Sequence, residues 1–156
     1  MIPIKHFATL IVCVAAAAAF AAATALPSEL VDLLTKAQIR EPLSSWCRGD
    51  FQARTPNTFA VAVPLSSGGG RYLILGLAET TIELVSFSGD ADLACYSLAE
   101  AKRLNESIVG SKTIHGGISP TLNTTVVCGF VDNTSAVCWQ YSPAKSAFVK
   151  VGEWVT

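Results

Sequence analysis

Two segments of the chain have the hydrophobic spacing of amphipathic helices. Between residues 26 and 39, apolar residues recur at i, i+3, i+4 and i+7, which predicts a helix with one apolar face. Ser28 is expected to cap the start of this helix. A second helix is expected to begin at Ser97, because Ser97 and Glu100 have the spacing of a capping box, and to end near Asn105.

The other strong pattern consists of short segments rich in apolar, β-branched and aromatic residues, with turn-forming residues between them. These segments are residues 58–63, 71–77, 80–87, 124–131, 135–141 and 145–155. Tight loops join most of them, which is typical of β-hairpins. The sequence therefore predicts an α+β domain: an antiparallel β-sheet of about six strands with an N-terminal helix and a mid-chain helix.

The start of the chain has the three parts of a secretory signal peptide. Lys5 gives a positive start, a long alanine-rich apolar run follows, and small residues lie at the −3 and −1 positions of a cleavage site after Ala25. We therefore expect a cleavable signal peptide over residues 1–25. A single domain, secreted or periplasmic, would then span residues 26–156.

Two other uses of this apolar run fit the sequence less well. As a permanent membrane anchor, about 19 residues just reach across the hydrocarbon layer, but alanine contributes little insertion energy. A lipid attached at Cys13 would need a small residue directly before it, and Val12 stands there. After cleavage we expect no stable membrane insertion.

The cysteines agree with export. Without Cys13, an even set remains, which an oxidising compartment allows to pair. Four cysteines permit three pairings, so the sequence alone leaves the connectivity open. In a hairpin over residues 124–141, Cys128 lies opposite Cys138, close enough for a disulfide. The preferred pairs are Cys128 with Cys138 and Cys47 with Cys95, and we expect the domain to be disulfide-stabilised.

The charge of the expected domain excludes several partners. The chain has 11 Lys and Arg against 12 Asp and Glu, and loss of Lys5 leaves 10 against 12, a net charge of −2. This balance gives no electrostatic basis for binding nucleic acid or an anionic membrane surface. The cysteine spacing, without a histidine nearby, does not fit zinc. We expect no metal and no cofactor.

Two short blocks, Gly49-Asp50-Phe51 and Phe59-Ala60-Val61, match the two ends of a known repeat pattern. They resemble the FG-GAP-like (integrin-type) repeat of small exported bacterial proteins. The resemblance implies a β-rich domain in which a calcium-loop-like turn leads into a strand. The positions that would supply the next calcium ligands are Gln52, Arg54 and Thr58. They cannot supply the oxygen ligands that calcium needs, so Asp50 is expected to cap a turn and is a candidate binding residue.

Two further features have a possible function. Arg48-Gly49-Asp50 is an integrin-binding tripeptide in other settings, although three-residue matches often arise by chance. His115 is the only histidine left after cleavage and is a candidate base or binding residue. A catalytic base needs a nucleophile and an orienting partner, and no serine lies in a G-x-S-x-G motif. We therefore assign no catalytic residue and expect His115 in a turn or on the surface.

These observations favour an exported, non-enzymatic domain that binds a protein or an envelope component, for instance as an inhibitor of a secreted enzyme. Two alternatives stay open. One is a small secreted hydrolase that uses His115 with a serine, and the other is a structural part of a surface assembly. The positions of His115 and Asp50 relative to any pocket distinguish the enzymatic from the non-enzymatic alternatives.

The mature protein is expected to begin at Leu26 and to contain no free thiol. Intact mass spectrometry of exported protein measures the cleavage site, and alkylation without reduction counts the thiols. A full-length chain in the membrane fraction would contradict cleavage, and alkylated cysteines would contradict the paired set.

Overall fold

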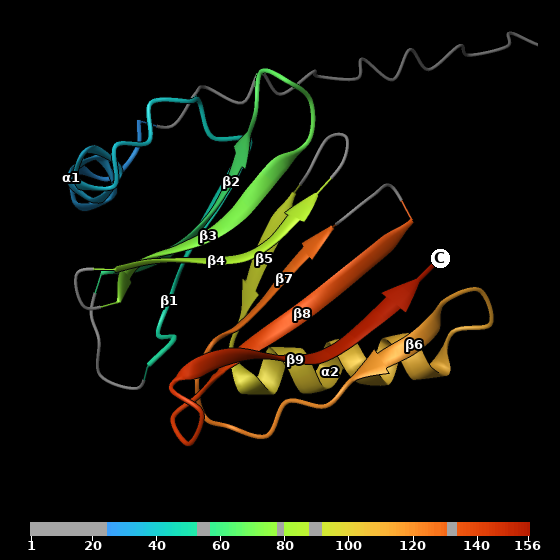
Figure 1. Ribbon diagram of the computed structural model, residues 1–156. Helices are drawn as coiled ribbons and strands as arrows, with labels where there is room; N and C mark the ends of the chain where they lie inside the picture. The colour runs from blue at the N-terminus through green and yellow to red at the C-terminus, as the bar shows by residue number, and fades with distance from the viewer. Residues whose placement is uncertain (1–24, 53–56, 78–79, 88–91, 131–133) are drawn as a thin grey trace, which may run out of the picture.

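The computed structural model describes residues 25–52, 57–77, 80–87, 92–130 and 134–156 (Figure 1). The expected signal peptide before Ala25 and the predicted ligand position Arg54 lie outside these residues. The described part contains two helices and nine strands. They are α1 (Ser28–Lys36), β1 (Ser45–Gly49), β2 (Thr58–Pro64), β3 (Gly70–Leu77), β4 (Thr80–Phe87), β5 (Leu93–Tyr96), α2 (Leu98–Gly110), β6 (His115–Ile118), β7 (Val126–Phe130), β8 (Ser135–Ser142) and β9 (Ala147–Val155).

The strands form two antiparallel sheets. Sheet A has four strands in the order β1-β2-β3-β4, and sheet B has five in the order β5-β7-β8-β9-β6. The α+β class, with antiparallel strands, two helices and disulfides, is confirmed. In the described residues, however, there are nine strands in two sheets, and not about six in one. The strands without a clear sequence signal are the short β1, β5 and β6.

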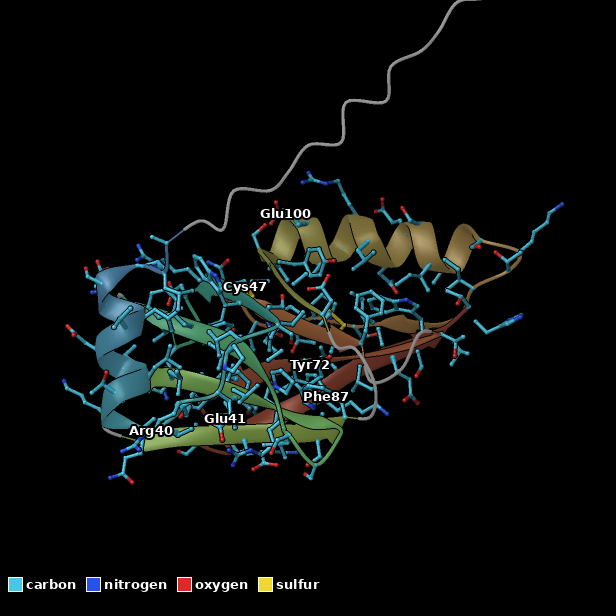
Figure 2. The ribbon with its side chains drawn as sticks, turned by 90° about the horizontal axis from the view of Figure 1, so that it is seen from above. Arg40, Glu41, Cys47, Tyr72, Phe87 and Glu100 are labelled. Carbon is cyan, nitrogen blue, oxygen red and sulfur yellow. A yellow bond between two sulfur atoms is a disulfide. The ribbon has the colours of Figure 1, made fainter. Side chains whose placement is uncertain are left out.

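The elements stack in four layers: α1, sheet A, sheet B and α2 (Figures 1 and 2). Leu30 and Leu34 of α1 pack on the outer face of sheet A, and Ala101 and Ile108 of α2 pack on the outer face of sheet B. The inner faces of the sheets meet in a third apolar cluster. Each central strand is therefore covered on both faces.

This layering explains why the central strands are almost uniformly apolar. In β2, Phe59 and Val61 belong to the cluster under α1, whereas Ala60 and Ala62 belong to the cluster between the sheets. Successive side chains of a strand point to opposite faces. A strand that is buried on both faces therefore needs apolar residues at every position, and does not alternate.

Helix α1 is shorter than the sequence predicted, although its apolar face is as expected. It starts at Ser28 after Pro27, and the N-cap residue Pro27 offers no side-chain cap, so the expected cap by Ser28 is wrong. The helix ends at Lys36, because Gln38 adopts a left-handed conformation with φ of 57°. The backbone N–H of Ile39 then donates to the carbonyl of Leu34, which is typical of a helix C-terminus.

Helix α2 has the predicted capping box but runs further than expected. The backbone amide of Glu100 donates to the Ser97 hydroxyl, and the Glu100 carboxylate accepts from the Ser97 backbone amide at 2.8 Å. The Ser97 hydroxyl also donates to this carboxylate at 2.7 Å, and this bond, followed by the one from the Ser97 backbone amide, holds the pKa of Glu100 below its usual range. The helix continues past Asn105 to Gly110, and the Asn105 side chain accepts a hydrogen bond from the backbone of Ile118. This bond ties α2 to β6.

The two sheets are joined along one side, where β1 meets β5. A disulfide from Cys47 to Cys95 links these strands, with a Cα–Cα distance of 5.8 Å. The second disulfide joins Cys128 and Cys138, which are directly opposed in β7 and β8 with a Cα–Cα distance of 4.1 Å. Such a short distance is typical of a non-hydrogen-bonded antiparallel pair. Both bonds are the pairs that the sequence analysis preferred.

Tyr72 of β3 connects the centre of sheet A to sheet B (Figure 2). Its hydroxyl lies 2.9 Å from the carbonyl oxygen of Asp92 and is also within hydrogen-bonding distance of the carbonyl oxygen of Phe130. Burial, with a smaller contribution from the negative charge of Asp92, raises the pKa of Tyr72. The hydroxyl therefore keeps its proton and remains a donor to sheet B at physiological pH.

Gly129 of β7 makes room for the Tyr72 ring. A Cβ atom at position 129 would lie 2.5 Å from Cε2 of Tyr72, which is far inside van der Waals contact. The ring also packs beside Phe87 and Trp139, with centroid distances of 4.7 and 6.3 Å. The close approach of the two sheets at this point therefore requires glycine.

Gly129→Ala is expected to lower the free energy of unfolding by about 1–3 kcal/mol, because the added methyl group overpacks the Tyr72 ring. Gly110→Ala is the matched control, since no atom lies within 4 Å of its Cβ position. We expect the control to be unchanged or slightly more stable. Urea denaturation with the disulfides intact measures both, and equal midpoints would contradict the packing argument.

Candidate functional site

A groove lies along the side of the sandwich opposite the β1–β5 junction. There β4, the last strand of sheet A, faces β8 and β9 of sheet B across a space of about 420 Å³. We refer to this space as the edge groove. Its lining includes Ile82, Glu83, Leu84, Trp139, Phe148 and Lys150.

The β4 wall of the edge groove depends on a β-bulge. Leu84 is an extra residue in β4, because its neighbours Glu83 and Val85 pair with consecutive residues of β3. In a regular strand, Ile82 and Phe87 would point to opposite faces. The bulge changes the side to which the following residues point, so both pack into the cluster between the sheets. All the large apolar side chains of β4 thereby face sheet B.

The sheet B wall is aromatic. Trp139 of β8 is only 7% exposed, and Phe148 of β9 is half-buried. The Phe148 ring makes edge contacts with Tyr141 and Phe51 at centroid distances of 5.5 and 5.9 Å. Lys150 follows Phe148 on the same face of β9 and lines the groove beside it. The groove therefore has an apolar wall on each side, with Lys150 on β9 and Glu83 on β4 at its rim.

Two exposed ion pairs flank the edge groove. Arg71 Nη1 lies 3.8 Å from Glu83 Oε2, and Lys150 Nζ lies 2.6 Å from Glu153 Oε2. Each of these side chains is more than a third exposed. Ion pairs in water contribute little to stability, so both can exchange their partners for a charged ligand at small cost.

A smaller hollow of about 310 Å³ lies at Tyr141 of β8. Its lining residues are Gln52, Thr124, Tyr141 and Pro143. Tyr141 lines this hollow and contacts Phe148, which lines the edge groove. The two spaces therefore lie on either side of one aromatic pair.

The buried side chain of Gln140 binds the backbone of residues 121–124, the loop beside the smaller hollow. Its side chain is fully buried, and its Oε1 accepts hydrogen bonds from the backbone amides of Thr121 and Leu122, both at 3.2 Å. Its Nε2 donates to the carbonyl oxygens of Leu122 and Thr124 at 2.6 and 3.0 Å. The Thr124 hydroxyl, by contrast, is buried without a hydrogen-bond partner in the described part of the chain.

Asp50 and His115 do not form one site. The backbone of Asp50 exchanges two hydrogen bonds of 2.8 Å with Thr125, at the start of β7. The start of β7 lies beside Gln140 of β8. His115 pairs with Val155 of β9, which in turn pairs with Ser135 at the other end of β8. Five residues of strand separate the two levels by about 17 Å. Neither candidate is part of the lining of the edge groove or of the smaller hollow.

His115 is exposed at the first position of the edge strand β6. The serine at the same level of the sheet is Ser135, and Val155 of β9 stands between them. Two strand spacings separate Ser135 from His115 by about 10 Å, which is beyond hydrogen-bonding reach. Ser135 is therefore not arranged as a nucleophile for His115.

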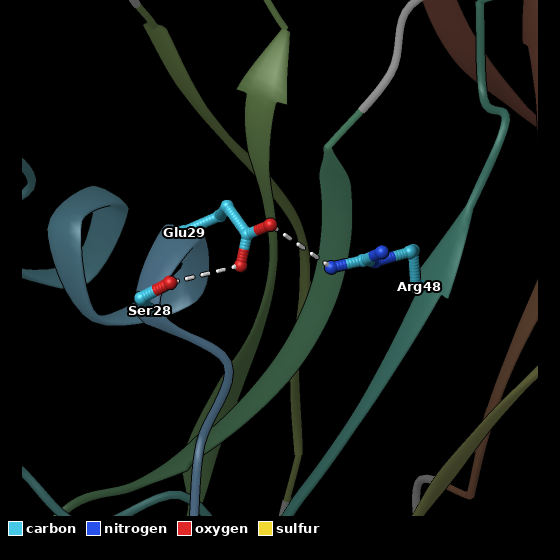
Figure 3. A network of polar contacts seen from close by, with 3 residues as sticks. All are labelled: Ser28, Glu29 and Arg48. Carbon is cyan, nitrogen blue, oxygen red and sulfur yellow. Dashed lines mark hydrogen bonds and ion pairs between the residues drawn. The ribbon is translucent and has the colours of Figure 1, made fainter.

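Arg48 is held against α1 and does not stand free. The Glu29 carboxylate lies between the Ser28 hydroxyl and the Arg48 guanidinium (Figure 3). The Ser28 hydroxyl donates to it at 3.3 Å, and Arg48 Nη2 lies 3.8 Å from it. The guanidinium also lies 5.0 Å from the ring centroid of Phe59. The pKa of Glu29 lies below its usual value, first because its own backbone amide donates to the carboxylate, and then through Ser28 and Arg48.

The remaining observations set limits on the class of site. Among the described residues, His, Cys, Asp and Glu form no cluster of three that could hold a metal ion. No helix in the described ranges is both long and apolar enough to cross a membrane. In comparisons with known proteins, no family model, no curated protein and no solved structure matches the chain. The FG-GAP-like resemblance therefore stays a prediction from two short blocks.

The sequence analysis did not identify the edge groove. Trp139, which forms part of its wall, is almost fully buried. The available signal was the order of apolar residues in β4, where Leu84 and Val85 are adjacent and interrupt the alternation. This irregularity marks a bulge, but it does not say which strands face each other across it.

Gln140→Leu is expected to destabilise the protein by on the order of 3 kcal/mol, because several buried backbone groups lose their partners. Thr124→Val is the matched comparison, because it removes a buried hydroxyl that has no hydrogen-bond partner among the described residues. It is expected to be neutral or stabilising. Chemical denaturation measures both changes, and amide exchange over Thr121–Thr125 should rise only in Gln140→Leu. A harmless Gln140→Leu would contradict this role.

Proposed function

We propose that this chain is an exported, non-enzymatic interaction domain, which binds a protein or an envelope component through the edge groove. The observation that carries the proposal is the continuity of the groove with the core between the sheets. Ile82, Leu84 and Phe148 pack on this core but remain only partly covered. A ligand that enters the groove completes their burial, and apolar burial drives most protein association.

Two observations support the export of the domain. The first 25 residues have the order of a secretory signal. The described chain has two disulfides, and such bonds persist in oxidising compartments and are rare in the cytosol. Together they favour a secreted or periplasmic location.

The positions of the titratable candidates support a binding function over the hydrolase alternative. His115 lies outside the linings of both hollows and about 10 Å from Ser135. The residues that line the edge groove include aromatic and aliphatic side chains with one acid and one base at the rim. Such a lining suits recognition by contact better than acid–base chemistry.

Leu84→Asp is expected to abolish partner capture, because it places a charge in the apolar groove. Val31→Asp is the control: Val31 is 44% exposed on α1, on the other side of sheet A. Wild type and both variants serve as baits for chemical crosslinking in envelope extract of the source organism, and mass spectrometry identifies the captured proteins.

Proteins retained by wild type and Val31→Asp but lost with Leu84→Asp support the proposal. Identical sets for all three baits contradict it. Thermal unfolding first establishes that Leu84→Asp is folded, and Lys150→Glu replaces it if it is not. Hydrolysis of ester or glycan substrates by wild type but not by His115→Ala would favour the hydrolase instead.

A further inference from the structure

In the described residues, sheet A ends at β4 on the side of the edge groove. In the described residues, sheet A has four strands and sheet B has five, and the two sheets join at β1 and β5. Counted from this junction, sheet A ends at β4 while sheet B continues through β9 to β6. At the level of the edge groove, however, β9 is itself the edge of sheet B in the described residues, because β6 pairs only with residues 152–155 and the groove is lined by residues 147, 148 and 150. The groove therefore opens between two sheet edges, β4 on one side and the start of β9 on the other.

The outer edge of β4 is suited to receive an added strand. In the described part of the chain, β4 pairs only with β3, so its other edge presents backbone N–H and C=O groups. Glu83 contacts Arg71, and its neighbours Ile82 and Leu84 pack on the inter-sheet core. A strand added here gains main-chain hydrogen bonds from β4 and apolar contacts from the groove wall.

We propose that an extended segment of a partner protein adds to β4 as a fifth strand of sheet A, with apolar side chains in the groove and an acidic residue facing Lys150. The proposal rests on the proposed binding function and names the class of partner. Alternate side chains of such a segment enter the groove between Leu84 and Trp139, because the side chains of a strand alternate between its faces.

The positive charge of Lys150 favours an acidic residue at the facing position of the added strand. Lys150 follows Phe148 on the face of β9 that lines the groove, so a side chain of the added strand that enters the groove comes near its ammonium group. Its present partner, Glu153, is exposed, and an exposed ion pair costs little to exchange. A carboxylate on the incoming strand pairs with Lys150, whereas a cation there is repelled.

The bulge at Leu84 limits which segments can pair with β4 as an added strand. Bulges twist an edge strand and interrupt its pairing, which protects against indiscriminate addition. The added strand is therefore short and depends on its side chains in the groove as well as on its backbone. This combination of main-chain bonds and pocket contacts gives selective binding.

The test uses blocked synthetic peptides of the length of β4, 8 residues. They alternate valine and threonine and have glutamate, glutamine or lysine at the centre. A second set has the same sequences with N-methyl groups on alternate residues, which remove the backbone donors of one edge. Amide chemical shifts give the affinity and the location of binding, and hydrogen exchange reports protection of β4. The proteins are the mature domain, Lys150→Glu and the control Lys102→Glu on α2.

The glutamate peptide is expected to bind wild type about fivefold more tightly than the lysine peptide, as an exposed charge pair allows. Lys150→Glu is expected to reverse this order, and Lys102→Glu to leave it unchanged. Binding should protect β4 amides and should be lost on N-methylation. Equal binding of methylated peptides, shifts outside the edge groove, no binding of any peptide at about 1 mM, or an unchanged charge order in Lys150→Glu overturns the proposal.

Two outcomes separate this inference from the function on which it rests. A partner captured by wild type but not by Leu84→Asp, without protection of β4 by any peptide, overturns strand addition and leaves the interaction domain standing. Sedimentation of the free protein tests a second copy as the occupant. A dimer with protected β4 amides overturns the proposal, because the edge is then filled by the chain itself.

Discussion

The ring of Tyr72 lies against the backbone of Gly129, and its hydroxyl reaches the carbonyl oxygens of Asp92 and Phe130 on sheet B. One side chain of β3 therefore sets both the distance and the lateral position of the two sheets. The other large residues of the inner layer, Phe87 and Trp139, pack around this ring. Because the contact is to backbone as well as side chains, small shifts of one sheet over the other would break it.

The edge groove follows from how the sheets meet. The disulfide from Cys47 to Cys95 closes the β1–β5 side, and Tyr72 fixes the centre, so the groove opens at the β4 side of the described sandwich. The apolar side chains there belong to the inter-sheet core and extend it to the surface. An exposed apolar surface that continues a core is a common property of interaction sites.

The proposed binding surface also has a rigid support. Trp139 is held by the Tyr72 cluster, and Phe148 is held by the rings of Tyr141 and Phe51. Beneath Tyr141, the buried amide of Gln140 fixes the neighbouring loop. A preorganised wall of this kind lowers the entropy lost on binding, which favours recognition of a flexible, extended ligand.

The sequence by itself determined the local features of this protein. The helix periodicity and the Ser97–Glu100 capping box depend on residues close in the chain, and so does the register that sets Cys128 opposite Cys138. These features could be predicted from the sequence because the interacting groups are a few residues apart or lie in one hairpin. The uniform apolar character of β2 and β3 also reflected burial, although not the identity of the covering layers.

Tertiary structure alone decided the division into two sheets and the position of the groove. The short strands β1, β5 and β6 form because their neighbours pair with them, and their own patterns are too short to predict this. Asp50 and His115 are separated, and Leu84 and Trp139 are brought together, by packing between segments distant in sequence. Such contacts depend on which faces meet, and hydrophobic patterning specifies that a face is buried but not against what.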